Sequence, residues 1–161
     1  VQSRPGQGAT FTFYLPALAP LTPAEDAREA ESAQRTGAGL ILLVEDNAMT
    51  REAISDTLVE LGYRVLEAEN GLQALQVLQE QPGVDLVLSD LVMPEMDGIA
   101  LQKALRETFP HVSILLMSGY PLGRQEQQEA LPPEVPHLRK PFTAGQLARN
   151  IERLLHEDRA G

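Results

Sequence analysis

Five polar side chains lie at the ends of short apolar runs or directly after them: Glu45, Asp46, Asp90, Ser118 and Lys140. Three of these are acids, and three carboxylates in one cleft repel one another by roughly 4 kcal/mol per pair at about 4 Å and an effective dielectric constant of about 20. A cation must offset that repulsion. A few carboxylates with waters and a phosphate are typical ligands of Mg²⁺. Lys140 and Ser118 offer a positive charge and a hydroxyl donor suited to phosphate oxygens.

The apolar runs and the stretches between them predict the elements that would position these side chains. Several runs are nearly continuous aliphatic segments, which is typical of strands covered on both faces. The runs are Leu40–Val44, Arg64–Ala68, Asp85–Ser89, Val112–Met117 and Val135–Leu138.

Amphipathic helix patterns with recognisable capping signals lie between these runs. One stripe ends at Gly62, and the pairs Asn70/Gln73 and Thr143/Gln146 resemble capping boxes. Strand and helix therefore alternate five times, which predicts an α/β fold with a parallel five-stranded sheet and helices on both faces. Ligands of such sheets bind at the carboxyl ends of the strands.

Composition narrows the classes of function. The chain has 161 residues, a formal net charge of −10 and no cysteine. This acidity disfavours binding to a nucleic-acid backbone, and the absence of cysteine excludes disulfides, thiolate zinc sites and cysteine nucleophiles. No apolar run approaches the roughly 18 residues of a membrane span, and the first residues lack signal-peptide character, so we expect a cytoplasmic domain without membrane contact.

Four motifs, in this order, carry a resemblance to a known family: LILLVEDN, VDLVLSDLVMPEMDG, ILLMSGY and HLRKPF. Together they resemble the receiver domain of two-component response regulators over about three quarters of the chain. The resemblance implies a flavodoxin-like (βα)5 fold with strand order 2-1-3-4-5. It implies that Asp90 is the phosphoryl acceptor and that Ser118 and Lys140 contact the phosphoryl group.

The same resemblance implies a Mg²⁺ (or Mn²⁺) site made by Glu45, Asp46, Asp90 and the backbone carbonyl of Val92. A carboxylate can act as the covalent nucleophile that forms an aspartyl phosphate. One position departs from the family pattern: three residues before Lys140, where Tyr or Phe is usual, this chain has His137. We expect Ser118 and His137 to be the switch positions, with His137 giving a weaker or pH-sensitive switch.

A second, shorter resemblance lies at the start of the chain. The segment SRPGQGATFTFYLP, Ser3–Pro16, is similar to the final strands of the ATP-binding domain of sensor histidine kinases. We therefore expect residues 1–16 to be the end of such a domain, 17–38 a flexible linker and 39–158 the receiver domain of a hybrid histidine kinase. The ATP motifs are absent, so we expect no kinase activity of this fragment. The resemblance implies a histidine kinase core and a histidine phosphotransfer protein as partners.

Two other functions compete with the phosphoacceptor. A haloacid-dehalogenase-like phosphatase also uses a strand-end Asp with Mg²⁺, but it needs a second Asp two residues later, where this chain has Val92. A flavin-binding flavodoxin-like module needs a loop rich in Ser, Thr and Gly after the first strand, and the acids Glu45 and Asp46 would repel a flavin phosphate there. Sustained phosphomonoester turnover would favour the first alternative, and a yellow preparation the second.

Overall fold

The computed structural model describes residues 2–4, 8–10, 39–119 and 135–159. Near the start of the chain, β1 (Gln2–Arg4) pairs in antiparallel fashion with β2 (Gly8–Thr10). The predicted linker, 17–38, lies outside the described residues, as does the segment that joins the fourth and fifth strands of the main sheet.

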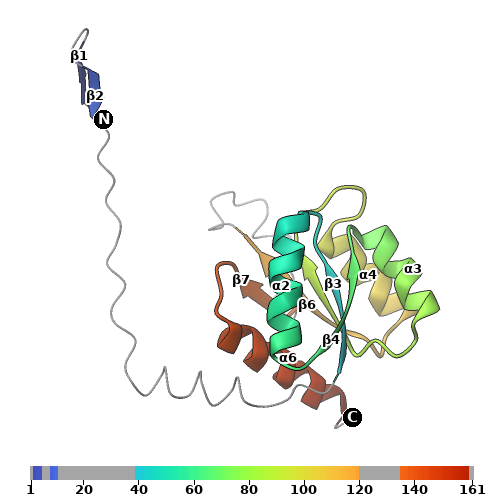
Figure 1. The fold of residues 1–161 in the computed structure, drawn as a ribbon. Helices are drawn as coiled ribbons and strands as arrows, with labels where there is room; N and C mark the ends of the chain where they lie inside the picture. Colours follow the sequence, from blue (N-terminus) through green and yellow to red (C-terminus); the bar gives the residue numbers. More distant parts are fainter. Residues whose placement is uncertain (1, 5–7, 11–38, 120–134, 160–161) are drawn as a thin grey trace.

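The main sheet has five parallel strands (Figure 1). They are β3 (Leu40–Val44), β4 (Arg64–Ala68), β5 (Leu86–Asp90), β6 (Ser113–Ser118) and β7 (His137–Arg139). Their spatial order is β4-β3-β5-β6-β7. Counted along the sheet-forming part of the chain, this is the predicted order 2-1-3-4-5, so the predicted flavodoxin-like fold is confirmed.

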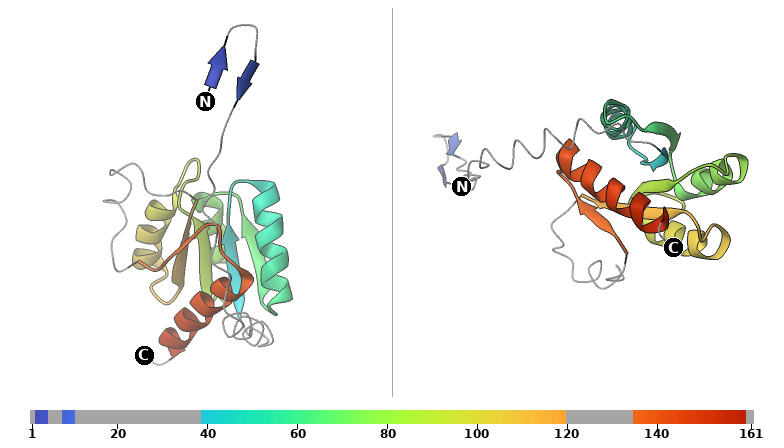
Figure 2. Two further views of the ribbon diagram at one scale, coloured as in Figure 1. Left: turned by 90° about the vertical axis from the view of Figure 1, so that its left-hand side faces the viewer. Right: turned by 90° about the horizontal axis from the view of Figure 1, so that it is seen from below.

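Helices cover both faces of this sheet (Figure 2). The described helices are α2 (Ala48–Glu60), α3 (Gly71–Glu80), α4 (Gly98–Thr108) and α6 (Ala144–Arg159). Side chains of α2 and α6 share one hydrophobic cluster with alternate residues of the central strands, such as Leu43 and Leu88, whereas α3 and α4 form the other cluster with the intervening residues, such as Leu42 and Val87. This alternation follows from the two-residue period of a strand.

The predicted strand boundaries hold at two runs and shift at three. β3 and β4 match the predicted runs residue for residue, whereas β5 and β6 each begin and end one residue later than predicted, and β7 covers only His137–Arg139. Asp85 directly precedes β5, and its carboxylate accepts a hydrogen bond from the Leu40 backbone N–H at 2.7 Å. Asp85 thus contacts β3 through its side chain, although it is not itself a strand residue. The shift places Asp90 and Ser118 as the last residues of their strands.

The predicted helix ends are confirmed where the structure shows them. Gly62, with φ 89°, follows α2, and positive φ is readily adopted by glycine. Thr143 and Gln146 form a reciprocal capping box at the start of α6. Among the described residues, no helix has the length and apolar character to cross a bilayer.

Candidate functional site

The three predicted acids come together at the carboxyl edge of the sheet. Glu45 and Asp46 follow β3, and Asp90 ends the neighbouring strand β5. One carboxylate oxygen of each lies within 4.8 Å of the others. Glu45 is buried, Asp90 is partly buried and Asp46 is exposed. The arrangement is a half-open acidic pocket with one wall in the core and one side facing solvent.

Lys140 bridges two of these acids. Its Nζ lies 2.6 Å from Glu45 Oε2 and 3.2 Å from Asp90 Oδ1. The Lys140 side chain is 20% exposed and that of Glu45 only 3%, so the lysine neutralises a carboxylate that water barely reaches. Burying an unpaired charge costs several kcal/mol. The ion pair with Glu45 therefore holds the ammonium group beside Asp90.

Backbone bonds place Ser118 and Lys140 on the same edge. The Lys140 N–H donates to the Ser118 carbonyl at 2.8 Å, and the Leu91 N–H donates to the Met117 carbonyl at 2.9 Å. Because Asp90 is in register with Met117, Ser118 lies one residue beyond the partner of Asp90 on the adjacent strand. It is buried. The structure thus brings the side chains of Glu45, Asp46, Asp90 and Lys140 together and places Ser118 at the same edge of the sheet.

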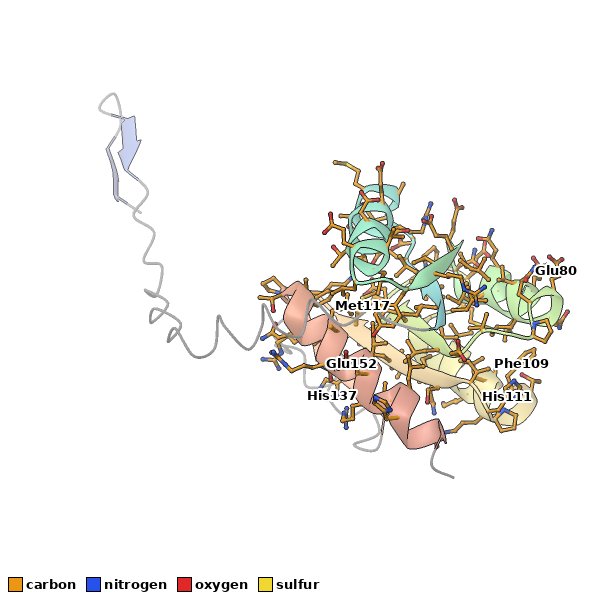
Figure 3. All side chains as sticks on the ribbon, turned by 60° about the horizontal axis from the view of Figure 1, so that its bottom comes forward. Glu80, Phe109, His111, Met117, His137 and Glu152 are labelled. Carbon is orange, nitrogen blue, oxygen red and sulfur yellow. The ribbon has the colours of Figure 1, made fainter. Side chains whose placement is uncertain are left out.

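The two other residues predicted for the site, Val92 and His137, are both exposed. The Val92 side chain is 63% exposed, in the loop after β5. His137 begins β7 and is exposed (Figure 3). Its Nδ1 lies 3.5 Å from the Val135 carbonyl oxygen. The roles of the Val92 carbonyl and of His137 as a switch stay predictions.

The loop after Asp90 is fixed by its own sequence. Asp97 caps α4 by accepting from the Ala100 N–H at 2.7 Å. A Cβ on Gly98 would lie 2.5 Å from the Asp90 carbonyl oxygen. Glycine at this position lets the start of α4 pack directly against the backbone of Asp90. The Gly98 N–H in turn donates to the Leu91 carbonyl at 3.0 Å.

The electrostatics of the pocket favour a divalent cation. Three carboxylates meet one ammonium group there, which leaves an excess of negative charge. The donors are all oxygen, and the exposed side leaves room for waters. Oxygen donors with retained waters are the coordination that Mg²⁺ prefers. The residues present therefore fit a Mg²⁺ site.

One contact at this edge was not anticipated from the sequence. Arg51, one turn into α2, donates from Nη1 to the Glu45 backbone carbonyl at 2.7 Å. Its position five residues after Asp46 gives a weak signal, because an arginine on a helix is usually a solvated surface residue. In the folded protein, α2 packs against β4. The Arg51 side chain is therefore only 13% exposed, and it turns back toward Glu45.

Comparison with known proteins decides the family. Residues 41–152 match the response regulator receiver domain. The chain belongs to the response regulator receiver domain family. Its acidic pocket is thus the acidic pocket of a receiver domain, a class that functions as phosphoacceptor in two-component signalling, and neither the phosphatase nor the flavin-binding alternative is retained.

Individual relatives agree with this membership. The chain is 36% identical to the sensor kinase CckA of Brucella abortus over 163 residues, which is 96% of this chain but 17% of that protein. It is also 36% identical to the response regulator receiver protein CpdR of Brucella abortus, over 71% of this chain and 95% of that protein. A crystal structure of the receiver domain from the hybrid histidine kinase CckA superposes with a TM-score of 0.60 at 34% identity, covering 73% of this chain and 99% of that one.

Proposed function

We propose that this receiver domain accepts a phosphoryl group on Asp90. The observation that carries the proposal is the pair of contacts of Lys140, whose Nζ lies between Glu45 and Asp90 at the end of parallel strands. A strand-end carboxylate held beside a partly buried lysine and two further acids has the parts that phosphoryl transfer requires: a nucleophile, a cation site and a fixed positive charge.

The transfer is a displacement at phosphorus. A carboxylate oxygen of Asp90 attacks the phosphorus of a phosphohistidine, the P–O bond forms, and the P–N bond to the imidazole breaks. The imidazole leaves with the bonding electron pair and is protonated by solvent. In this proposal, Lys140 and the Ser118 hydroxyl bind oxygens of the transferred group.

The cation site of the proposal is made by Glu45, Asp46 and Asp90, with the carbonyl of Val92 as a further ligand. When bound, Mg²⁺ would neutralise negative charge on the phosphoryl group during transfer. Glu45 contributes mainly from the buried side, because its carboxylate also pairs with Lys140, and the exposed Asp46 closes the pocket toward solvent.

Labelling with acetyl phosphate and Mg²⁺, followed by mass spectrometry of the modified peptides, tests this assignment. We expect the modified peptide to contain Asp90 and expect Asp90→Asn to abolish the adduct. Asp97→Asn is the matched control, because it removes an acid from the same loop while an amide can still cap α4. Label on the Asp90→Asn variant, or none on the unaltered protein, would refute the proposal.

We also propose that the parent protein is a hybrid histidine kinase. The similarity of this chain to the sensor kinase CckA covers 96% of the chain, so it extends beyond the receiver match into the first residues. Within those residues, the antiparallel pair β1 and β2 supports a segment taken from the edge of a sheet. The division into 1–16, 17–38 and 39–158 belongs to this proposal.

In such a protein the phosphoryl group comes from the kinase histidine in cis and passes to, or is drained from, a histidine phosphotransfer protein. Exposed apolar side chains near the carboxyl edge, Met49 at 82% and Val92 at 63% exposure, support a protein partner at this surface. Phosphotransfer from a labelled histidine phosphotransfer domain, in both directions, tests this. Unchanged transfer to a Met49→Ser, Val92→Ser variant would exclude these two side chains from the contact.

A further inference from the structure

Hydrogen bonds hold the main chain on both sides of the Glu45 Cα. The Glu45 N–H donates to the Ala68 carbonyl at 3.1 Å, which extends the pairing of β3 with β4 by one residue. The Glu45 carbonyl accepts from Arg51 Nη1 at 2.7 Å. This carbonyl belongs to the peptide unit that leads into Asp46, so its orientation sets the direction in which the Asp46 side chain leaves the backbone.

Asp46 depends on this backbone more than its neighbours do. Glu45 is held by Lys140 at 2.6 Å and Asp90 by the same ammonium group at 3.2 Å. Within the described parts of the chain, the Asp46 carboxylate makes no hydrogen bond or ion pair of its own. Its place in the acidic pocket therefore rests on the main chain that carries it.

Arg51 is itself anchored from the edge strand. Its Nε lies 3.4 Å from Glu67 Oε2 and its Nη2 lies 3.3 Å from Glu69 Oε1. Glu67 is held in turn by the Ser55 hydroxyl, which donates to its Oε1 at 2.7 Å. The planar guanidinium group has five donors in a fixed fork. Two glutamates of the β4 side thus fix the plane that directs Nη1 at the Glu45 carbonyl.

We propose that Arg51 is a positioning residue for the cation site, fixing the Glu45–Asp46 peptide so that Asp46 faces Glu45 and Asp90. The inference rests on the proposed function, because it concerns the same site. Arg51 acts through the main chain and not through its charge. Its positive charge is already paired with Glu67 and Glu69, and no contact joins its guanidinium group to a carboxylate of the described acidic pocket.

The two possible effects of Arg51 on Mg²⁺ binding have opposite signs. If only its charge mattered, removing a cation near three carboxylates would strengthen the binding of another cation. If it positions Asp46, removing it weakens Mg²⁺ binding, because outer-shell partners of metal ligands typically contribute about tenfold or more to metal affinity. We therefore expect Arg51→Met to raise the Kd for Mg²⁺ alone about tenfold.

The measurement is isothermal titration with Mg²⁺ on the full chain, at a temperature where circular dichroism shows the variant folded. Arg64→Met is the matched control, because Arg64 is an exposed arginine at the start of β4, at the opposite end of the strand. It removes the same charge, and we expect its Kd to stay at or below that of the unaltered protein. The amide resonance of Asp46 should shift in Arg51→Met and not in Arg64→Met.

Arg51→Lys covers the case in which Arg51→Met does not fold. Lysine keeps the charge but has one nitrogen, which cannot serve the carbonyl and both glutamates together, so we expect weakened Mg²⁺ binding here too. If the folded Met variant, or the Lys variant in its place, binds Mg²⁺ as tightly as the unaltered protein or more tightly, the positioning role is overturned and the cation site stands. If the unaltered protein binds no Mg²⁺, the proposed function falls together with this inference.

Discussion

The two ends of the main sheet handle polar groups in opposite ways. At the amino end, Asp85 and Leu40 exchange two bonds, at 2.7 Å through the Asp85 carboxylate and at 2.9 Å through its N–H. At the carboxyl end, three carboxylates lie close together, and the one ammonium group among them pairs with only two of them. At the amino end, the two bonds between Asp85 and Leu40 pair their polar groups locally and contribute stability. The carboxyl end has an excess of negative charge that a cation can neutralise. Without a cation, repulsion between the carboxylates lowers the stability of the fold.

Truncating a buried leucine at the amino end of the sheet should lower the free energy of unfolding more than any other change considered below. Leu86 begins β5 and is fully buried, so Leu86→Ala leaves a cavity and should lower the free energy of unfolding by about 3 kcal/mol. Urea unfolding measures this. The Kd for Mg²⁺ of the folded variant should stay unchanged. A loss of stability below about 1 kcal/mol, or a weakened cation site, would break the separation of the two ends.

The next effect comes from a buried phenol at the same end. Burial, and secondly the negative charge of Glu152 on α6 (Figure 3), raise the pKa of Tyr63 to about 12. The unfolded chain ionises this group near pH 10. The resulting stabilisation is fully present below pH 10 and is lost as the pH rises toward 12. It should amount to about 2 to 3 kcal/mol.

Urea unfolding at pH 9 and at pH 11.5 checks this prediction, with Tyr63→Phe as the control that lacks the ionisable hydroxyl. The variant should lose less stability between the two pH values than the unaltered protein. Equal losses in both proteins would mean that Tyr63 does not contribute to the alkaline limit of the fold.

Removing one acid at the carboxyl end should change stability less, and in the opposite direction. Asp90→Asn removes one of three mutually repelling carboxylates, while Lys140 keeps its closer partner Glu45. We expect the metal-free variant to be more stable by about 1 kcal/mol. Added Mg²⁺ should then stabilise it less than it stabilises the unaltered protein.

Thermal unfolding with EDTA and with Mg²⁺ makes this measurement. Asp56→Asn is the charge-matched control, because Asp56 is an exposed acid on α2, and its stability should hardly change. A less stable metal-free Asp90→Asn protein would show that the Asp90 carboxylate contributes more through its ion pair with Lys140 than it costs through repulsion.

Much of this architecture could be predicted from the sequence, because apolar runs and turn residues encode strands and helix ends directly. Leu40–Val44 was placed residue for residue. The one-residue shift of β6 could not be predicted, since Val112 is buried like a strand residue but lies before the ladder begins. Burial and backbone pairing are separate properties, and only the first is visible in a hydrophobic pattern.

Some features of the candidate site could likewise be predicted from the sequence, and others could not. That Glu45, Asp46, Asp90, Ser118 and Lys140 gather at one edge follows from strand order alone. That Lys140 lies closer to Glu45 than to Asp90 depends on side-chain lengths and on the depth of each group, which no spacing reveals. The contact of Arg51 depends on how α2 lies against β4, two elements whose approach is set by the core beneath them.

The packing of Gly98 against the Asp90 carbonyl has a consequence for how this chain tolerates change. A Cβ there would meet backbone and not a flexible side chain, with the Asp90 oxygen at 2.5 Å and Leu91 Cα at 3.1 Å. A library of variants scored for phosphate uptake should therefore find position 98 as intolerant of substitution as position 90. The reason would be shape alone, and a residue without any functional group would stand out among those that carry the chemistry.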